Sequence, residues 1–98
     1  MLRKSYSKKG RSCRVTFDLP ADGKTNSVSL CGDFNDWDPG VQPLKRRKDG
    51  RFSITLILAS GREYRFKYLL DGHRWENDWK ADDYVSNCFG TEDSLITV

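Results

Sequence analysis

The sequence predicts an all-β fold, an antiparallel β-sandwich of about seven short strands. Apolar and polar residues alternate through several short windows, which is the pattern of half-buried strands. Glycine, proline, asparagine and aspartate separate these windows, as turns require. No window repeats apolar residues at helical spacing. With 98 residues, of which 37% are hydrophobic, the chain has the size of one domain with a modest core.

The strands follow from this alternation in chain order. Residues 11–19 place their apolar side chains on one face and end at the turn PADGK, and residues 27–32 repeat the pattern more briefly. Residues 44–47 read LKRR, and their lysine and arginines suit a short edge strand that avoids pairing with other chains. The remaining predicted strands are residues 51–58, 63–70, 73–77 and 94–98.

Two Asp-Gly dipeptides, at residues 49–50 and 71–72, predict hairpin turns before and after the central strands. In the strand at residues 63–70, aromatic residues alternate with Arg65, Lys67 and Leu69. Lys67 is therefore predicted to lie on the outward face. The polar segment at residues 79–93 is predicted to be irregular.

The formal charge of +3 is unevenly distributed, because residues 1–14 hold six lysines or arginines and no acid. We interpret residues 1–11 as a basic flexible tail and residues 12–98 as the folded domain. The tail has no recognition motif, so we expect no nucleic-acid partner. No apolar run could cross a bilayer and no apolar segment follows the basic start, so we expect a cytoplasmic protein without membrane contact.

The cysteines and the single histidine form no metal or redox motif. Cys13, Cys31 and Cys88 are widely spaced, and His73 completes no usual zinc spacing with them. We expect the cysteines to be small buried hydrophobes and predict neither a metal nor a cofactor.

The acidic residues do not predict calcium binding or catalysis. The loop from Asp33 begins like an EF-hand, but its third ligand position is Trp37 and its twelfth is Leu44. We expect Asn35 and the flanking acids to fix this loop instead. The sequence contains no recognisable Ser-His-Asp arrangement, nucleophile elbow or phosphate loop. The other acidic residues lie in short polar segments typical of turns. We predict no catalytic residue and expect that the chain is not an enzyme.

Three tryptophans, Trp37, Trp75 and Trp79, lie in loops or at strand ends beside polar residues. A pyranose ring has an apolar C–H face and an equator of hydroxyls, so its site pairs a flat aromatic surface with hydrogen-bonding groups. The neighbours of Trp37 and Trp75 favour this role, with Trp37 exposed at a loop tip. For Trp79 we expect packing.

Three motifs in order, GDFNDW at residues 32–37, YRFKYLLDGHRW at 64–75 and NCFGTEDSLITV at 87–98, resemble carbohydrate-binding module family 48. The family includes the glycogen-binding domain of the β subunit of AMP-activated protein kinase. It also includes the isoamylase N-terminal, or early-set, domains that precede the barrel of branching and debranching enzymes. The similarity covers residues 15–98 and implies an immunoglobulin-like sandwich that binds α-1,4-glucan.

The resemblance also implies site residues. In the family, two tryptophans stack on successive glucose units and a strand lysine reaches their hydroxyls. The matching positions here are Trp37, Trp75 and Lys67, and Arg74 looks like an extra residue before the second tryptophan.

The closing segment adds three further positions to the implied site. Phe89, Thr91 and Asp93 stand where the family has leucine, threonine and asparagine. Phe89 enlarges the apolar surface. Asp93 can accept hydrogen bonds from sugar hydroxyls but cannot donate them.

Three functions remain open. The leading hypothesis is a non-catalytic module for glycogen, starch-like polymer or malto-oligosaccharide. The second is an accessory domain of the α-amylase-type glycoside hydrolase and branching-enzyme system that acts with a separate catalytic partner. The third is a protein-interaction module without sugar binding, in which the basic tail and residues 45–48 contact a protein or an anion.

Overall fold

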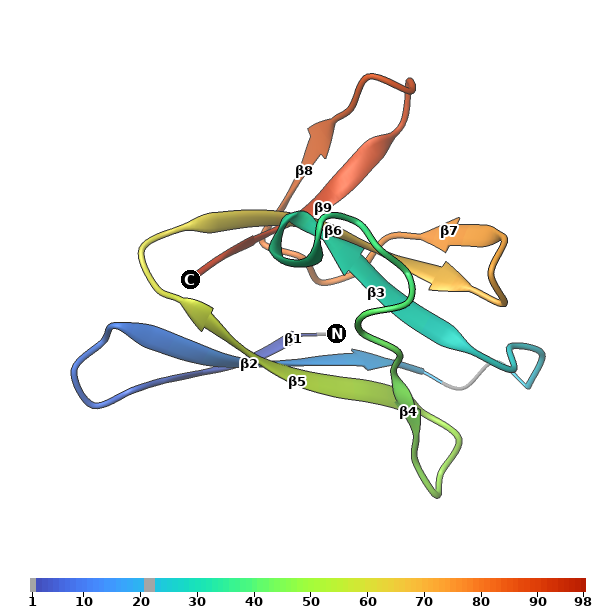
Figure 1. The fold of residues 1–98 in the computed structure, drawn as a ribbon, viewed down its shortest axis with the longest axis horizontal. Coiled ribbons are helices and arrows are strands. Elements are labelled where there is room, and N and C mark those ends of the chain that lie inside the picture. Colours follow the sequence, from blue (N-terminus) through green and yellow to red (C-terminus); the bar gives the residue numbers. More distant parts are fainter. Residues whose placement is uncertain (1, 21–22) are drawn as a thin grey trace.

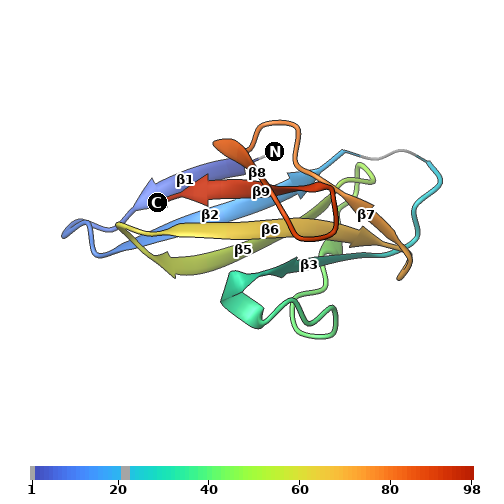
Figure 2. The ribbon, with the colours of Figure 1, turned by 90° about the horizontal axis from the view of Figure 1, so that it is seen from above.

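Two antiparallel sheets face each other across a shared core (Figure 1). The structure is a computed structural model that describes residues 2–20 and 23–98. Its elements are β1 (Leu2–Tyr6), β2 (Ser12–Leu19), β3 (Val28–Gly32), the 3₁₀ turn η1 (Asp33–Asn35), β4 (Lys45–Arg46), β5 (Phe52–Ala59), β6 (Glu63–Leu70), β7 (Arg74–Glu76), β8 (Asp83–Ser86) and β9 (Glu92–Thr97). One sheet has the order β1-β2-β5-β4, and the other β3-β6-β9-β8 with β7 also paired to β6. Figure 2 shows the second sheet lying over the first.

The predicted all-β antiparallel sandwich is confirmed, although the part of the chain that the structure describes contains nine strands rather than about seven. The additional strands are β1 and β8. β1 lies in the expected flexible tail, where residues 2–6 pair with β2 from Leu2↔Phe17 to Tyr6↔Cys13. Backbone pairing along a sheet edge needs no apolar alternation, so the sequence pattern did not reveal it. Residue 1 of the tail and residues 21–22 of the PADGK turn lie outside the described residues.

The core fills the space between the sheets with the inward-facing side chains of both. Phe17 and Phe66 meet edge to face with ring centroids 5.2 Å apart, and Phe66 contacts Tyr68 in the same way at 5.8 Å. The predicted inward face of β6 is confirmed. The buried cluster contains Cys13, Val15, Phe17, Val28, Leu30, Leu44, Phe52, Leu58, Phe66, Tyr68, Leu70, Ile96 and Val98.

A buried polar contact ties the segment after β7 to this core. The hydroxyl of Tyr68 donates a hydrogen bond to the Asp78 carboxylate at 2.7 Å, and the Asp78 amide donates one to Ser94 Oγ at 2.9 Å. Burial, with the Asp78 carboxylate beside it, raises the pKa of Tyr68, so the hydroxyl keeps its proton and remains a donor. Asp78 thereby attaches the segment between β7 and β8 to Tyr68 of β6 and Ser94 of β9.

Two burial expectations need correction. Cys88 is exposed, whereas Cys13 and Cys31 are buried as expected. Leu69 alternates with the inward-facing residues of β6 but is also buried, and its Cα partner on the neighbouring strand β7 is Trp75. Within residues 2–20 and 23–98, no helix is long and apolar enough to span a membrane.

Candidate functional site

The loop that carries Trp37 is held by its own polar side chains. Asn35 accepts a hydrogen bond from the Gly32 amide at 3.0 Å and donates one to a β3 carbonyl at 2.8 Å. Asp33 accepts one from the Arg65 amide on β6 at 2.9 Å and one from the Trp37 indole at 3.2 Å. These contacts confirm, for Asn35 and Asp33, the expectation that Asn35 and the flanking acids fix the loop.

The backbone of this loop is unusual and brings it close to β6. Asp36 and Trp37 have φ angles of 55° and 59°, a left-handed conformation that is uncommon for residues other than glycine. At Gly32 a Cβ atom would lie 2.5 Å from the Arg65 carbonyl oxygen, so only glycine fits. Trp37 is half-buried rather than fully exposed at a loop tip, and its ring N–H donates the hydrogen bond to Asp33.

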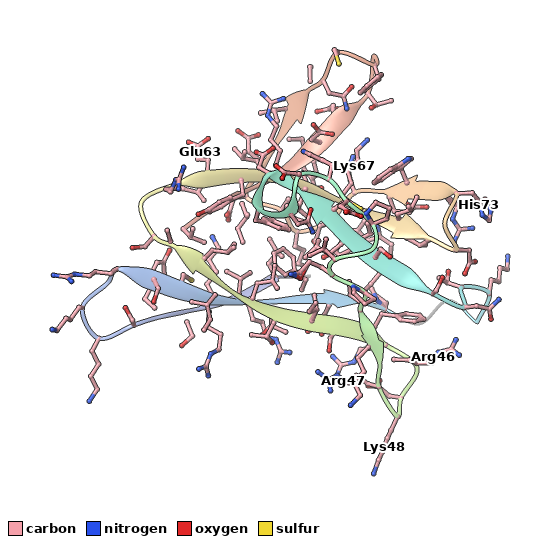
Figure 3. All side chains as sticks on the ribbon, in the orientation of Figure 1. Arg46, Arg47, Lys48, Glu63, Lys67 and His73 are labelled. Atoms are coloured by element: carbon pink, nitrogen blue, oxygen red, sulfur yellow. The ribbon has the colours of Figure 1, made fainter. Side chains whose placement is uncertain are left out.

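Trp75 and Lys67 come from β7 and β6 on the outer face of the second sheet. Trp75 is the Cα partner of Leu69, two positions along β6 from Lys67, so the two side chains share that face. Trp75 is 48% exposed. The Lys67 ammonium donates a hydrogen bond to Thr91 Oγ1 at 3.2 Å. Figure 3 shows Lys67 on the outer side of this sheet, beside the loop after β3.

The loop between β8 and β9 is organised by Asn87. Its amide nitrogen donates hydrogen bonds to Thr91 Oγ1 at 2.8 Å and to Asp93 Oδ1 at 3.0 Å. Its amide oxygen accepts from the backbone N–H groups of Phe89, at 2.9 Å, and Thr91, at 3.2 Å. The loop therefore holds the Phe89 ring out in solvent, where it is 86% exposed.

Asp93 lies beneath this loop and is only 7% exposed. Its carboxylate oxygens are 3.8 Å from Lys67 Nζ and 4.0 Å from Arg65 Nη1, in addition to the hydrogen bond from Asn87. The two cations balance the buried charge, as a carboxylate in such a position requires. Asp93 thus holds Lys67 and Asn87 in place from below.

A groove of ≈ 840 Å³ joins these elements. It contains all of the residues that the sequence predicts for the site, namely Trp37, Lys67, Trp75, Phe89, Thr91 and Asp93. It also contains residues that the sequence reasoning missed, namely Asp33, Arg65, Ser86, Asn87 and Cys88. Flat aromatic surfaces therefore stand beside an ammonium, a guanidinium and hydroxyl and amide groups, the combination that a pyranose ring requires.

Two residues qualify the sequence-based view of this region. Asn87 begins an Asn-x-x-Gly turn, and asparagine in such a turn often forms hydrogen bonds with nearby backbone groups. This motif is the sequence feature from which the role of Asn87 in the loop could be predicted. Trp79 is 79% exposed and does not line the groove, so the expectation that it packs is wrong. Among the described residues, no group of three or more His, Cys, Asp or Glu side chains could hold a metal ion.

A β-sandwich whose outer sheet face carries such an aromatic-lined, hydrogen-bonding groove has the architecture typical of a carbohydrate-binding module. Residues 13–98 match the family model for the glycogen recognition site of AMP-activated protein kinase. The chain belongs to this family, which confirms the resemblance to carbohydrate-binding module family 48.

Curated relatives agree with this membership. The chain is 38% identical over 77 residues to a 1,4-alpha-glucan branching enzyme of Aquifex aeolicus, a match that covers 76% of this chain and 12% of the enzyme. It is 30% identical over 78 residues to an amylopullulanase of Thermoanaerobacterium thermosulfurigenes, covering 76% of this chain and 4% of that protein. The chain thus spans a small fraction of the length of these relatives.

Proposed function

We propose that the protein is a non-catalytic module that binds α-1,4-glucan, with glucose units stacked on Trp37 and Trp75 and hydroxyls bound by Lys67. The observation that supports this most is the placement of the two indoles. Trp37 follows β3 and Trp75 lies on β7, the strands on either side of β6, and both line one groove with Lys67 of β6.

The energetics suit a docking role. A stacked sugar face removes roughly 60 to 100 Å² of apolar surface from water, which contributes about 1.5 to 2.5 kcal/mol for each tryptophan. After the cost of ordering a flexible glucan, two such platforms and a few hydrogen bonds leave a Kd of about 1 mM to tens of µM. A polymer with many equivalent sites raises the effective strength of such binding.

The β8–β9 loop completes the proposed site. The exposed Phe89 ring offers a further apolar surface in the lining of the groove. Thr91 supplies a hydroxyl, and Asp93 supplies acceptor oxygens next to the ammonium of Lys67. A glucan that curves from one indole to the other would pass over these groups.

A titration with maltoheptaose tests the proposal. Backbone amide shifts and tryptophan fluorescence should change around Trp37, Lys67 and Trp75, and cellohexaose, a flat β-linked chain, should have a much smaller effect. Absence of any change at about 10 mM maltoheptaose, far above the expected Kd, would contradict sugar binding and favour a protein-interaction module.

A second candidate is an accessory domain that acts with a separate catalytic partner. It is favoured by the relatives, which are named as glucan-processing enzymes and of which this chain matches 12% or less. Incubation of the repurified chain with amylopectin should release no reducing ends. Steady release that survives repurification would instead require a catalytic centre within this chain.

A further inference from the structure

A second, basic pocket lies on the outer face of the other sheet, across the sandwich from the sugar groove. Its volume is ≈ 430 Å³. It is lined by Arg3, Thr16, Asp18, Arg47, Lys48, Asp49, Arg51, Ser53 and Thr55, from β1, β2, β5 and the β4–β5 turn. Figure 3 shows Arg46, Arg47 and Lys48 together at the edge of the molecule away from Lys67.

The contacts inside the basic pocket orient its cations. Arg3 pairs with the buried Asp18 at 2.9 Å, which holds its guanidinium against the sheet. Arg51 pairs with Asp49 across the tip of the turn at 2.8 Å. Both arginines line the pocket, one from β1 and one from the end of the β4–β5 turn.

Arg47 and Lys48 supply the remaining positive charge. Arg47 Nε donates a hydrogen bond to Ser53 Oγ at 2.6 Å, which fixes its guanidinium within the lining of the pocket. A guanidinium has five N–H donors in a planar fork, so one bond to Ser53 leaves most of them for an oxyanion. Lys48 is exposed at the rim.

The charge balance of the basic pocket indicates the kind of ligand. Four cationic side chains face two carboxylates, which leaves an excess of two positive charges. A phosphate monoester carries about −1.5 to −2 at pH 7 and three acceptor oxygens, and arginine forks bind these oxygens in pairs. The charge of a single phosphate monoester therefore matches the excess.

The lining also indicates what carries the phosphate. Among the described residues that line this pocket there is no aromatic ring, so neither a sugar ring nor a nucleobase would find a stacking surface. Serine and threonine hydroxyls instead suit the backbone of a peptide. We propose that this pocket binds a phosphorylated serine or threonine of a partner protein, on the face opposite the glucan, so that both ligands can be held at once.

The test uses the full chain and an acetylated five-residue peptide with a central phosphoserine. The phosphopeptide should shift amides of β5 and the β4–β5 turn, whereas the unphosphorylated peptide should not. In Arg47→Gln/Lys48→Gln the Kd should rise about tenfold, the loss typical of charged hydrogen bonds. The control Lys8→Gln/Lys9→Gln removes the same charge from the β1–β2 turn and should change the Kd by less than about twofold.

Three results would overturn phosphate binding at this pocket, and a fourth would overturn the choice of partner. The first three are equal weakening by both double variants, equal binding of the two peptides, and no binding at about 5 mM phosphopeptide, well above a weak Kd. Glucose 6-phosphate binding as tightly as the phosphopeptide would overturn the assignment to a protein partner. Maltoheptaose titrated into the same samples reports the sugar groove separately. If Arg47→Gln/Lys48→Gln unfolds, the phosphopeptide Kd of Lys48→Gln alone is compared with that of the control.

Discussion

The ammonium of Lys67 on β6 donates a hydrogen bond to the hydroxyl of Thr91, 3.2 Å away in the loop before β9. Asn87 donates to the same hydroxyl from the other side at 2.8 Å. An ammonium has three donors, so one bond to Thr91 orients the group and leaves others for a ligand. The strand lysine and the β8–β9 loop are therefore parts of one arrangement, and the variants below test it.

Replacing Lys67 by methionine should weaken maltoheptaose binding about tenfold, because a hydrogen bond from a charged group contributes roughly 1.5 kcal/mol or more. Methionine keeps most of the side-chain volume, so the groove should persist. Isothermal calorimetry gives the Kd. The matched control is Lys80→Met, since Lys80 is exposed and does not line the groove. Equal losses in both variants would contradict a specific role for Lys67.

Trp37→Ala and Trp75→Ala should each raise the Kd for maltoheptaose about tenfold or more, because each removes a platform that contributes about 1.5 kcal/mol. Trp79→Ala is the matched control, since Trp79 is the more exposed indole at 79% but lies outside the groove. It should leave the Kd unchanged. Circular dichroism must show that the β-sheet signal is retained. If Trp37→Ala and Trp75→Ala both unfold, the two indoles are needed for the fold, and a role in sugar binding would lose this support.

Asn87→Ala should weaken sugar binding about fivefold by releasing the loop that presents Phe89 and Thr91, since coupled neighbours typically interact by about 1 kcal/mol. Because the effect acts in part through Phe89, it should shrink when Phe89 is already alanine. Calorimetry on the two single variants and the double variant measures this coupling. Strictly additive losses would show that Asn87 does not act through Phe89.

The sequence predicted the features that depend on local pattern. Alternation identified the inward face of β6, including Phe66 and Tyr68, because a strand with one buried face must alternate. The loop motifs identified residues that the fold does bring into one groove, since Trp37 and Trp75 flank β6. Their role in binding remains a prediction.

Other features depend on contacts that no local pattern records. The tail forms β1 because its backbone forms antiparallel hydrogen bonds with the edge of β2. The groove includes the Arg65 side chain and the Asn87 amide only because β6 and the β8–β9 loop meet in space. The left-handed backbone of Asp36 and Trp37 and the lack of room for a Cβ atom at Gly32, where β3 pairs with β6, are likewise properties of the folded chain that no local pattern records.

Tyr68→Phe should lower the free energy of unfolding by about 2 kcal/mol, because it removes a hydrogen bond to a buried carboxylate. The bond is 2.7 Å long, and Asp78 is only 1% exposed. Urea denaturation followed by tryptophan fluorescence gives the value. Tyr84→Phe removes a hydroxyl that donates to the Asp78 carbonyl rather than to its carboxylate, and should cost less. An unchanged Tyr68→Phe midpoint would contradict the importance of this contact.

Asp71 should make stability depend on pH in the acid range. Its carboxylate accepts hydrogen bonds from the amides of Asn26, at 2.8 Å, and Ser27, at 3.0 Å, and these bonds lower its pKa. A lowered pKa in the folded state stabilises the fold above the unfolded-state pKa, and this contribution disappears as the pH falls through the folded-state value. Asp71→Asn should therefore be less stable than the parent chain at pH 7.

The stability difference between the parent chain and Asp71→Asn should shrink as the pH falls below the unfolded-state pKa of about 4 and should disappear once the pH lies below the lowered folded-state pKa, because the parent carboxyl is then protonated as well. Urea midpoints at four or five pH values measure it. The amide oxygen of asparagine can still accept from Asn26 and Ser27, so the comparison isolates the charge. A difference that stays constant across the whole range would show that the carboxylate charge does not contribute.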